Sequence, residues 1–324
     1  MSVEVIEDPR AFVEEDWSEV VAADPGGTFF HTPAYLKVWW EEFGAGAPAI
    51  ALLKEGRRTV AAGAFEFDDG VLRFLGGFDV TDYMGPVAIP GREAVAAKEL
   101  LSALEVLPWR RADLRGMPVA SAWYSALESA AVSHGYATER SSDGVAPMLP
   151  LPSRYAAYLA DLPPKLRHEL ERKRRRLVRE GGSHRLRRST AETLAPDLDR
   201  FLQLHRSSEG AKGTFMHPGM ELFFRRLGEA FLPRGLFRLS FLEIGGVSAA
   251  GAIGFVFGDT FYLYNSAFDR SLASFSPGTV LVSELIQEAI EEGMTAFDML
   301  KGDLGYKYRF GAVSRQVGRL QIMR

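Results

Sequence analysis

The sequence predicts a mixed α/β (α+β) protein of two domains, each with a mostly antiparallel sheet flanked by helices. Its 324 residues suggest two domains of about 150 residues each. Both halves contain three alternating apolar stretches joined by glycine turns, which is the pattern of a three-strand meander. In both halves, segments of helical periodicity precede and follow this meander. The repeated order indicates a duplicated architecture.

The elements of the first half follow from caps, turns and periodicity. They are a helix in HTPAYLKVWWEEFG, a meander within 47–77, a helix at 92–104, a strand at 111–114 and a helix at 122–134. Prolines and a glycine then interrupt the periodic pattern in the stretch 141–155. We therefore expect a domain boundary there, with domains at 1–150 and 151–324.

The second half opens with a strongly basic helix that Gly181 and Gly182 end. The predicted elements are helices at 165–180, 196–205 and 220–231, strands at 236–244, 247–257 and 260–267, a helix from Ser276, and strands at 295–300 and 316–322.

Charge is divided unevenly along the chain. The net charge is −4, but residues 1–150 carry −11 and residues 151–324 carry +7. Residues 165–188 alone carry +8. One local basic patch on an acidic protein indicates a particular anionic partner and argues against general affinity for DNA.

Composition excludes several classes of protein. The chain has no cysteine, which removes disulfides, cysteine nucleophiles and thiolate metal sites. It has no apolar run long enough to span a membrane, and MSVEVIEDPRAFVEED lacks the features of a signal peptide. We expect a cytoplasmic protein without a membrane span.

The helix in SFSPGTVLVSELIQEAIEEG has an explicit start. Ser276 is a suitable N-cap, Pro277 fits the first helical position, and Gly278 leaves the first turn uncrowded. The free N–H groups of a first turn carry the positive end of the helix dipole. This start predicts an anion site, and an ordinary capped helix is the alternative.

The order of meander, loop, capped helix and strand resembles the core of the GNAT acyltransferases. The second half is similar to the GNAT-type domain of CelD-like cellulose-biosynthesis proteins, relatives of the Fem-type peptidyltransferases. The matching stretches are KLRHELERKRRRLVREGG, FLQLHRSSEGAKGTF, GVSAAGAIGFVFGDTFYLYNSAFD and SPGTVLVSELIQEAIEEGMTAFDMLKGDLGYKYRFG, with FFHTPAYLKVWWEEFG and LRFLGGFDVTDYMGP in the first half. SFSPGT stands where ordinary GNAT enzymes have a Q/R-x-x-G-x-G/A loop.

This resemblance implies tandem GNAT-like domains, with acetyl-CoA or another acyl-CoA as co-substrate and no metal. The C-terminal domain would bind the acyl donor, and the N-terminal domain would shape the acceptor side. A strand would bind the pantetheine arm, and backbone amides at the helix start would hold the pyrophosphate. The residues implied are Tyr264, Asn265 and Ser266 on the strand, and Ser276, Gly278, Thr279 and Val280 at the helix start.

Direct attack of an amine on a thioester needs a base, a polarised carbonyl and an acid for the thiolate. FDMLKGDLGYKYRFG offers such groups. Asp298 follows an apolar strand residue, Tyr306 could protonate the thiolate, and Lys307 could hold a phosphate or an oxyanion. The resemblance to Fem-type proteins also implies a lysine at this site, with a polar structural loop as the alternative.

Two further loops are candidates for acceptor binding. LHRSSEGAKGTFMHP contains His205 and Glu209, although satisfied structural histidines are common, and the spacing gives no metal site. DVTDYMGP contains Asp82 and Tyr83, which would suit a cationic amine. An ordinary turn with no binding role is the alternative.

The function indicated is an N-acyltransferase, with two alternatives left open. A Fem-like peptidyltransferase would use aminoacyl-tRNA on a cell-wall precursor and bind RNA through the basic helix. A catalytically silent GNAT-like module would bind a ligand or partner. The basic helix itself could be a solvated surface, a contact for the CoA 3′-phosphate, or a contact for RNA. The acceptor, a small molecule or a glycan or peptide amine, is not encoded in any motif.

Overall fold

The structure, a computed structural model, describes residues 1–8, 17–77, 79–207 and 215–324. Its strands are mostly antiparallel and are flanked by helices, which confirms the predicted mixed α/β class. The chain divides into two compact units. The first comprises Met1–Val145 and Arg315–Arg324, and the second comprises Ala146–Ser314.

Two long strands continue across this division along the chain. They are β7 (Ala137–Pro150) and β13 (Val313–Met323). The stretch 141–155, where a domain boundary was expected, is mostly strand, because β7 runs through most of it. Pro147 lacks an N–H to donate but still takes part in the pairing, because its carbonyl accepts a hydrogen bond from the Met299 N–H at 2.9 Å.

The first unit is built on a sheet with one parallel pair. The strand order is β1, β2, β3, β4, β6, β13; β4 and β6 are parallel, and the other neighbours are antiparallel. The remaining strand, β5 (Val87–Ala88), pairs with β3. The bounds are β1 (Ser2–Ile6), β2 (Ala47–Glu55), β3 (Arg58–Asp68), β4 (Val71–Phe74) and β6 (Arg111–Pro118).

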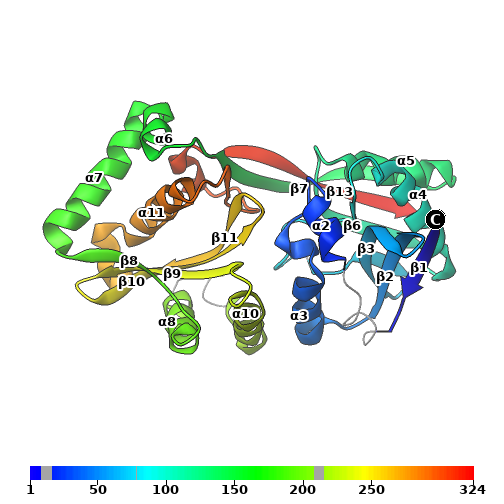
Figure 1. The fold of residues 1–324 in the computed structure, drawn as a ribbon, viewed down its shortest axis with the longest axis horizontal. Helices are drawn as coiled ribbons and strands as arrows, with labels where there is room; N and C mark the ends of the chain where they lie inside the picture. The colour runs from blue at the N-terminus through cyan, green and yellow to red at the C-terminus, as the bar shows by residue number, and fades with distance from the viewer. Residues whose placement is uncertain (9–16, 78, 208–214) are drawn as a thin grey trace. The chain divides into compact units, whose positions relative to one another are not determined.

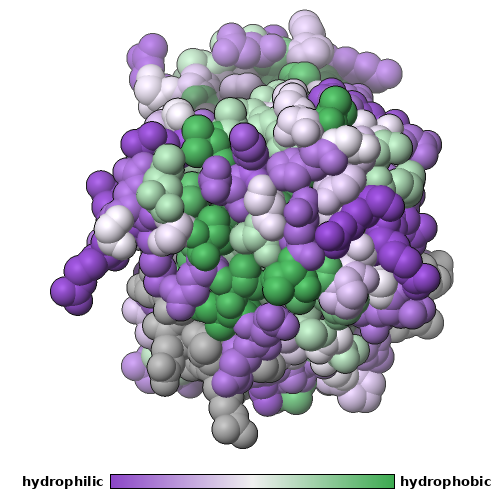
Figure 2. Space-filling model, turned by 90° about the vertical axis from the view of Figure 1, so that its right-hand side faces the viewer, coloured by the Kyte–Doolittle hydropathy of each residue, from purple (hydrophilic) through white to green (hydrophobic). Residues whose placement is uncertain are grey.

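Four α-helices accompany this sheet in the described residues. They are α2 (Ser18–Ala23), α3 (Pro33–Phe43), α4 (Glu93–Ala103) and α5 (Ala122–Ser133). The core between the sheet, α4 and α5 includes Leu100, Trp109, Leu127 and Leu320. One face of this unit carries hydrophobic residues between hydrophilic ones, as folded surfaces commonly do (Figure 2).

The second unit has the strand order β7, β12, β11, β10, β9, β8. Here β11 and β12 are parallel, and the other pairs are antiparallel. The bounds are β8 (His184–Arg188), β9 (Phe237–Ile244), β10 (Val247–Phe257), β11 (Thr260–Phe268) and β12 (Ala296–Asp298). Both units thus place one parallel pair after an antiparallel meander.

Helices cover both faces of the second sheet (Figure 1). On one side lie α6 (Tyr155–Asp161), α7 (Pro164–Gly181) and α11 (Pro277–Glu291), and on the other α8 (Leu194–Arg206) and α10 (Pro218–Phe231). The core beneath α11 includes Val282, Leu285, Ile286 and Phe297. In the described residues, no helix is long and apolar enough to cross a membrane.

Glycines shape the meander of this unit. Gly245, Gly246 and Gly258 have positive φ values at its two turns, as the sequence predicts. Gly254 lies under an aromatic ring, and a Cβ there would stand 2.3 Å from Cζ of Phe261. The small residue therefore lets the ring lie across β10.

Candidate functional site

The pair β11–β12 opens partway along its length. β12 pairs with β11 only from Thr260 to Tyr262 and ends at Asp298, whereas β11 continues to Phe268. In the described chain, no strand pairs with residues 263–268 of β11 on the β12 side. An edge without a strand partner is the arrangement on which an extended ligand can add to a sheet.

A bulge lies within this open part of β11. Ile253 of β10 faces Asn265, but the next residue, Gly254, faces Leu263, so Tyr264 is the extra residue. The ring of Tyr264 packs against Phe224 and Phe255. The structure thus places the three strand residues predicted to bind the cofactor, Tyr264, Asn265 and Ser266, together on the open edge.

The start of α11 lies next to the end of β11. A Cβ on Gly278 would be 3.4 Å from Cδ1 of Phe268. The expectation of three free amides is wrong for two of them, because Thr279 and Val280 donate their N–H groups to the Ser276 carbonyl at 3.0 and 3.2 Å. Pro277 has no N–H, so Gly278 offers the one amide of this turn that has no partner in the described residues.

A lysine from α7 reaches this first turn. Nζ of Lys173 donates to Oγ1 of Thr279 at 3.4 Å and pairs with Glu169 at 3.0 Å, with 12% of the lysine side chain exposed. The hydrogen bond from Lys173 lowers the pKa of Glu169, which indicates a cationic surrounding. Sequence reasoning identified the basic helix but not this residue, because the contact joins positions 106 apart.

The loop after β12 is held by buried charged groups. Asp298 is 2% exposed, and its Oδ1 accepts the Leu300 N–H at 2.8 Å. Lys307 is 3% exposed, and its Nζ donates to the carbonyls of Leu300 and Lys301 at 2.8 and 2.9 Å. The structure therefore brings two of the predicted catalytic residues into one loop, but the ammonium of Lys307 points at the main chain.

Tyr306 is the third predicted catalytic residue and the one at the surface. It is 38% exposed as a whole residue, yet desolvation around its hydroxyl raises the pKa of the phenol. The neighbouring Tyr308 hydroxyl lies 2.7 Å from both Asp303 and Ser314, which fixes the end of the loop. A phenol that stays protonated can donate a proton to a leaving thiolate.

The predicted acceptor-binding residues belong to different units of the chain. Asp82 and Tyr83 belong to the first unit, where Tyr83 is 4% exposed and its hydroxyl lies 2.5 Å from a guanidinium nitrogen of Arg315. His205 belongs to the second unit, is 1% exposed and packs beside Phe201. Burial at this level suits a structural histidine and not a base that meets substrate. Glu209 lies outside the described residues.

No group of three or more histidine, aspartate or glutamate side chains in the described ranges could hold a metal ion. The titratable groups of the candidate site are therefore considered as acids, bases and hydrogen-bond partners.

The chain is similar to one family model and to several solved structures. Residues 164–308 match the family model described as an acetyltransferase (GNAT) domain. No curated protein sequence matches the chain. Nothing in these matches distinguishes the CelD-like family within the superfamily.

Solved structures share the fold over nearly the whole chain. A conserved protein of unknown function from Bacteroides thetaiotaomicron has a TM-score of 0.67 at 12% identity and covers 99% of this chain and 100% of its own. FemX has a TM-score of 0.67 at 11% identity, and the match covers 99% of this chain and 97% of FemX. The C-terminal domain of a putative lysylphosphatidylglycerol synthetase from Agrobacterium fabrum has a TM-score of 0.64 at 13% identity. That match covers 98% of this chain and 93% of the other. At such identities the likeness concerns the fold alone, and the family match shows that residues 164–308 are similar to the model described as an acetyltransferase (GNAT) domain.

Proposed function

We propose that the second unit is an N-acyltransferase that moves an acyl group, an acetyl group in the simplest case, from acyl-CoA to an amine. The observation that carries this proposal is the open edge of β11, which leads at Phe268 to the first turn of α11. An extended pantetheine arm suits the open edge, and a diphosphate suits the helix start with Lys173 beside it.

The reaction is a direct transfer. The amine nitrogen forms a bond to the thioester carbonyl carbon, the carbon–sulfur bond breaks, and a proton passes from the nitrogen to a base. Tyr306 donates its phenolic proton to the departing thiolate, since a tyrosine phenol is protonated at neutral pH. Asp298 and Lys307 act as positioning residues, since their polar groups hold the main chain of the loop.

Thermal unfolding of the full chain tests the donor. Acetyl-CoA, longer acyl-CoAs, free CoA and aminoacyl-tRNA are compared at equal concentration. A ligand at one hundred times its dissociation constant adds about 2.7 kcal/mol, a shift of several degrees. We expect stabilisation by acyl-CoAs and a weaker response in Lys173→Met than in the exposed control Lys98→Met. If no acyl-CoA raises the transition of the wild type, the proposal is wrong.

A second candidate is an aminoacyl transferase that uses charged tRNA on a cell-wall precursor. The full-length likeness to FemX favours it, as do the exposed arginines of α7. It predicts salt-sensitive stabilisation by aminoacyl-tRNA and none by acyl-CoA. A silent binding module is the third candidate, and it predicts that Tyr306→Phe leaves cellular function intact.

A further inference from the structure

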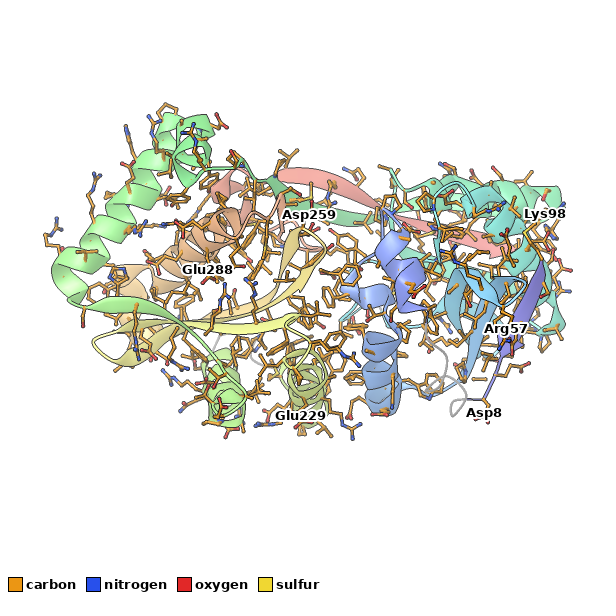
Figure 3. All side chains as sticks on the ribbon, viewed as in Figure 1. Asp8, Arg57, Lys98, Glu229, Asp259 and Glu288 are labelled. Carbon is orange, nitrogen blue, oxygen red and sulfur yellow. The ribbon has the colours of Figure 1, made fainter. Side chains whose placement is uncertain are left out.

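The outer side of α7 carries a row of basic side chains. The exposed residues Lys165, His168, Arg172, Arg175 and Arg179 recur at intervals of three and four positions, so they share one side of the helix. At about 1.5 Å per residue the row is about 21 Å long. Nitrogen-tipped side chains project along this side, away from α11 (Figure 3). We call these five residues the α7 basic row.

The opposite side of α7 is fixed to the second unit. Leu170 and Leu177 are 6% and 0% exposed and pack in the core. Arg174 donates to the side chain of Gln287 in α11 at 3.1 Å. The helix therefore cannot turn about its axis, and the α7 basic row is displayed in one direction.

Little within the described chain neutralises this row. Lys165 and Arg172 have no hydrogen bond or ion pair there. Arg175 lies 3.8 Å from Glu171 and Arg179 lies 2.6 Å from Glu180, but both arginine side chains are 71% exposed. Ion pairs at such exposure are weak and exchange readily for a multivalent anionic partner.

The row borders a shallow hollow of about 350 Å³. It is lined by Glu171, Arg174, Arg175, Val178 and Arg179. Arg175 and Arg179 line it beside Val178, which is 53% exposed, whereas the guanidinium of Arg174 bonds to Gln287. Guanidinium groups bind phosphate through paired hydrogen bonds, and the valine adds an apolar contact. The hollow therefore suits a phosphate ester with an apolar attachment.

We propose that the α7 basic row docks this protein on an anionic phospholipid surface, with a headgroup phosphate in the hollow. A straight helix meets a plane along its whole length, so every cation of the row can lie near the negative surface. The helix contains no phenylalanine, tyrosine or tryptophan on which a nucleic-acid base could stack. Val178 is the one large apolar residue exposed in α7, so contact is at the headgroups and without deep insertion.

Vesicle flotation with the full chain tests this docking. Vesicles of phosphatidylcholine with phosphatidylglycerol are compared with vesicles of phosphatidylcholine alone. We expect binding only to the anionic vesicles and a decline with added salt. The triple variant Arg172→Gln/Arg175→Gln/Arg179→Gln should lower the partition coefficient about 100-fold, because each cation near the surface contributes about fivefold.

A matched variant separates the effect of the α7 basic row on vesicle binding from the effect of net charge. Arg57→Gln/Arg58→Gln/Lys98→Gln removes three exposed cations from the first unit and should leave vesicle binding within about twofold. The triple lysine variant of the same α7 arginines should retain most binding, which excludes a folding defect as the cause. Failure of the wild type to bind anionic vesicles, an equal loss in the matched variant, or a row that binds tRNA but not vesicles would each overturn the proposal.

Discussion

Replacing Lys307 with methionine tests whether its ammonium clamps the loop after β12. The Nζ atom donates to the carbonyls of Leu300 and Lys301 at 2.8 and 2.9 Å in a residue that is 3% exposed. Methionine has similar length but no donor, so two carbonyls lose their partner at a cost of about 1–3 kcal/mol each. Removing a buried charge recovers part of this cost. We expect the loop to lose about 2–4 kcal/mol of local stability.

Hydrogen exchange followed by mass spectrometry measures this effect in peptides spanning 298–310. The Leu300 N–H, which bonds to Asp298, is the reporter. A loss of this size speeds its exchange about 30- to 700-fold when exchange follows the opening equilibrium. Lys98→Met, at an exposed position of α4, should change nothing in these peptides. If Lys307→Met abolishes stabilisation by acetyl-CoA while loop exchange is unchanged, Lys307 contacts the ligand and the clamp is refuted.

Three other substitutions probe the acid, an ion-pair network and a packing position. Tyr306→Phe should lower kcat about 100-fold or more while acetyl-CoA still raises the Tm, and equal kcat would exclude Tyr306 as the acid. Arg187→Gln breaks two hydrogen bonds to Asp197, at 2.7 and 2.8 Å, and should cost about 2–3 kcal/mol in urea unfolding. Burial raises the pKa of Asp197, but hydrogen bonds from Arg187, Ser189 and Thr193 together outweigh burial and leave that pKa lowered. The loss of stability in Arg187→Gln relative to wild type is therefore full above about pH 4 and shrinks as pH falls through the lowered pKa. Gly254→Ala places a Cβ 2.3 Å from the ring of Phe261 and should cost about 1–3 kcal/mol, read from the Tm.

Much of the fold could be predicted because its signals are local. The turns at Gly245-Gly246 and Gly258 require positive φ, and glycine marks them directly in the sequence. The course of β7 could not be predicted in this way. The prolines at its end indicate an interruption of regular structure at a domain boundary. Pairing with β12, far along the chain, nevertheless makes this end a strand. Non-local pairing of this kind overrides the local signal.

The sequence predicts which polar side chains lie near the end of β12 but not how they are arranged. Asp298 and Lys307 lie nine positions apart, so their proximity follows from the chain itself. The direction of the Lys307 ammonium depends on Leu300, which has a φ of +58°, a conformation that leucine rarely adopts. Nothing in the residue type signals this turn of the backbone. The contact of Lys173 with Thr279 was equally hidden, because it needs the packing of α7 on α11.

Ser276 is also left-handed, with a φ of 53°, and its side chain does not cap α11. Its own carbonyl accepts from Thr279 and Val280, so its hydroxyl and the Gly278 N–H have no partner in the described residues. Glycine at 276 should relieve about 1 kcal/mol of backbone strain and raise the Tm slightly. If this start of α11 is shaped for an anion, Ser276→Gly should nevertheless weaken acetyl-CoA binding severalfold in a titration, since a hydroxyl donor is lost. Stronger binding together with a higher Tm would mean that Ser276 opposes the ligand, and the anion site would have to lie elsewhere.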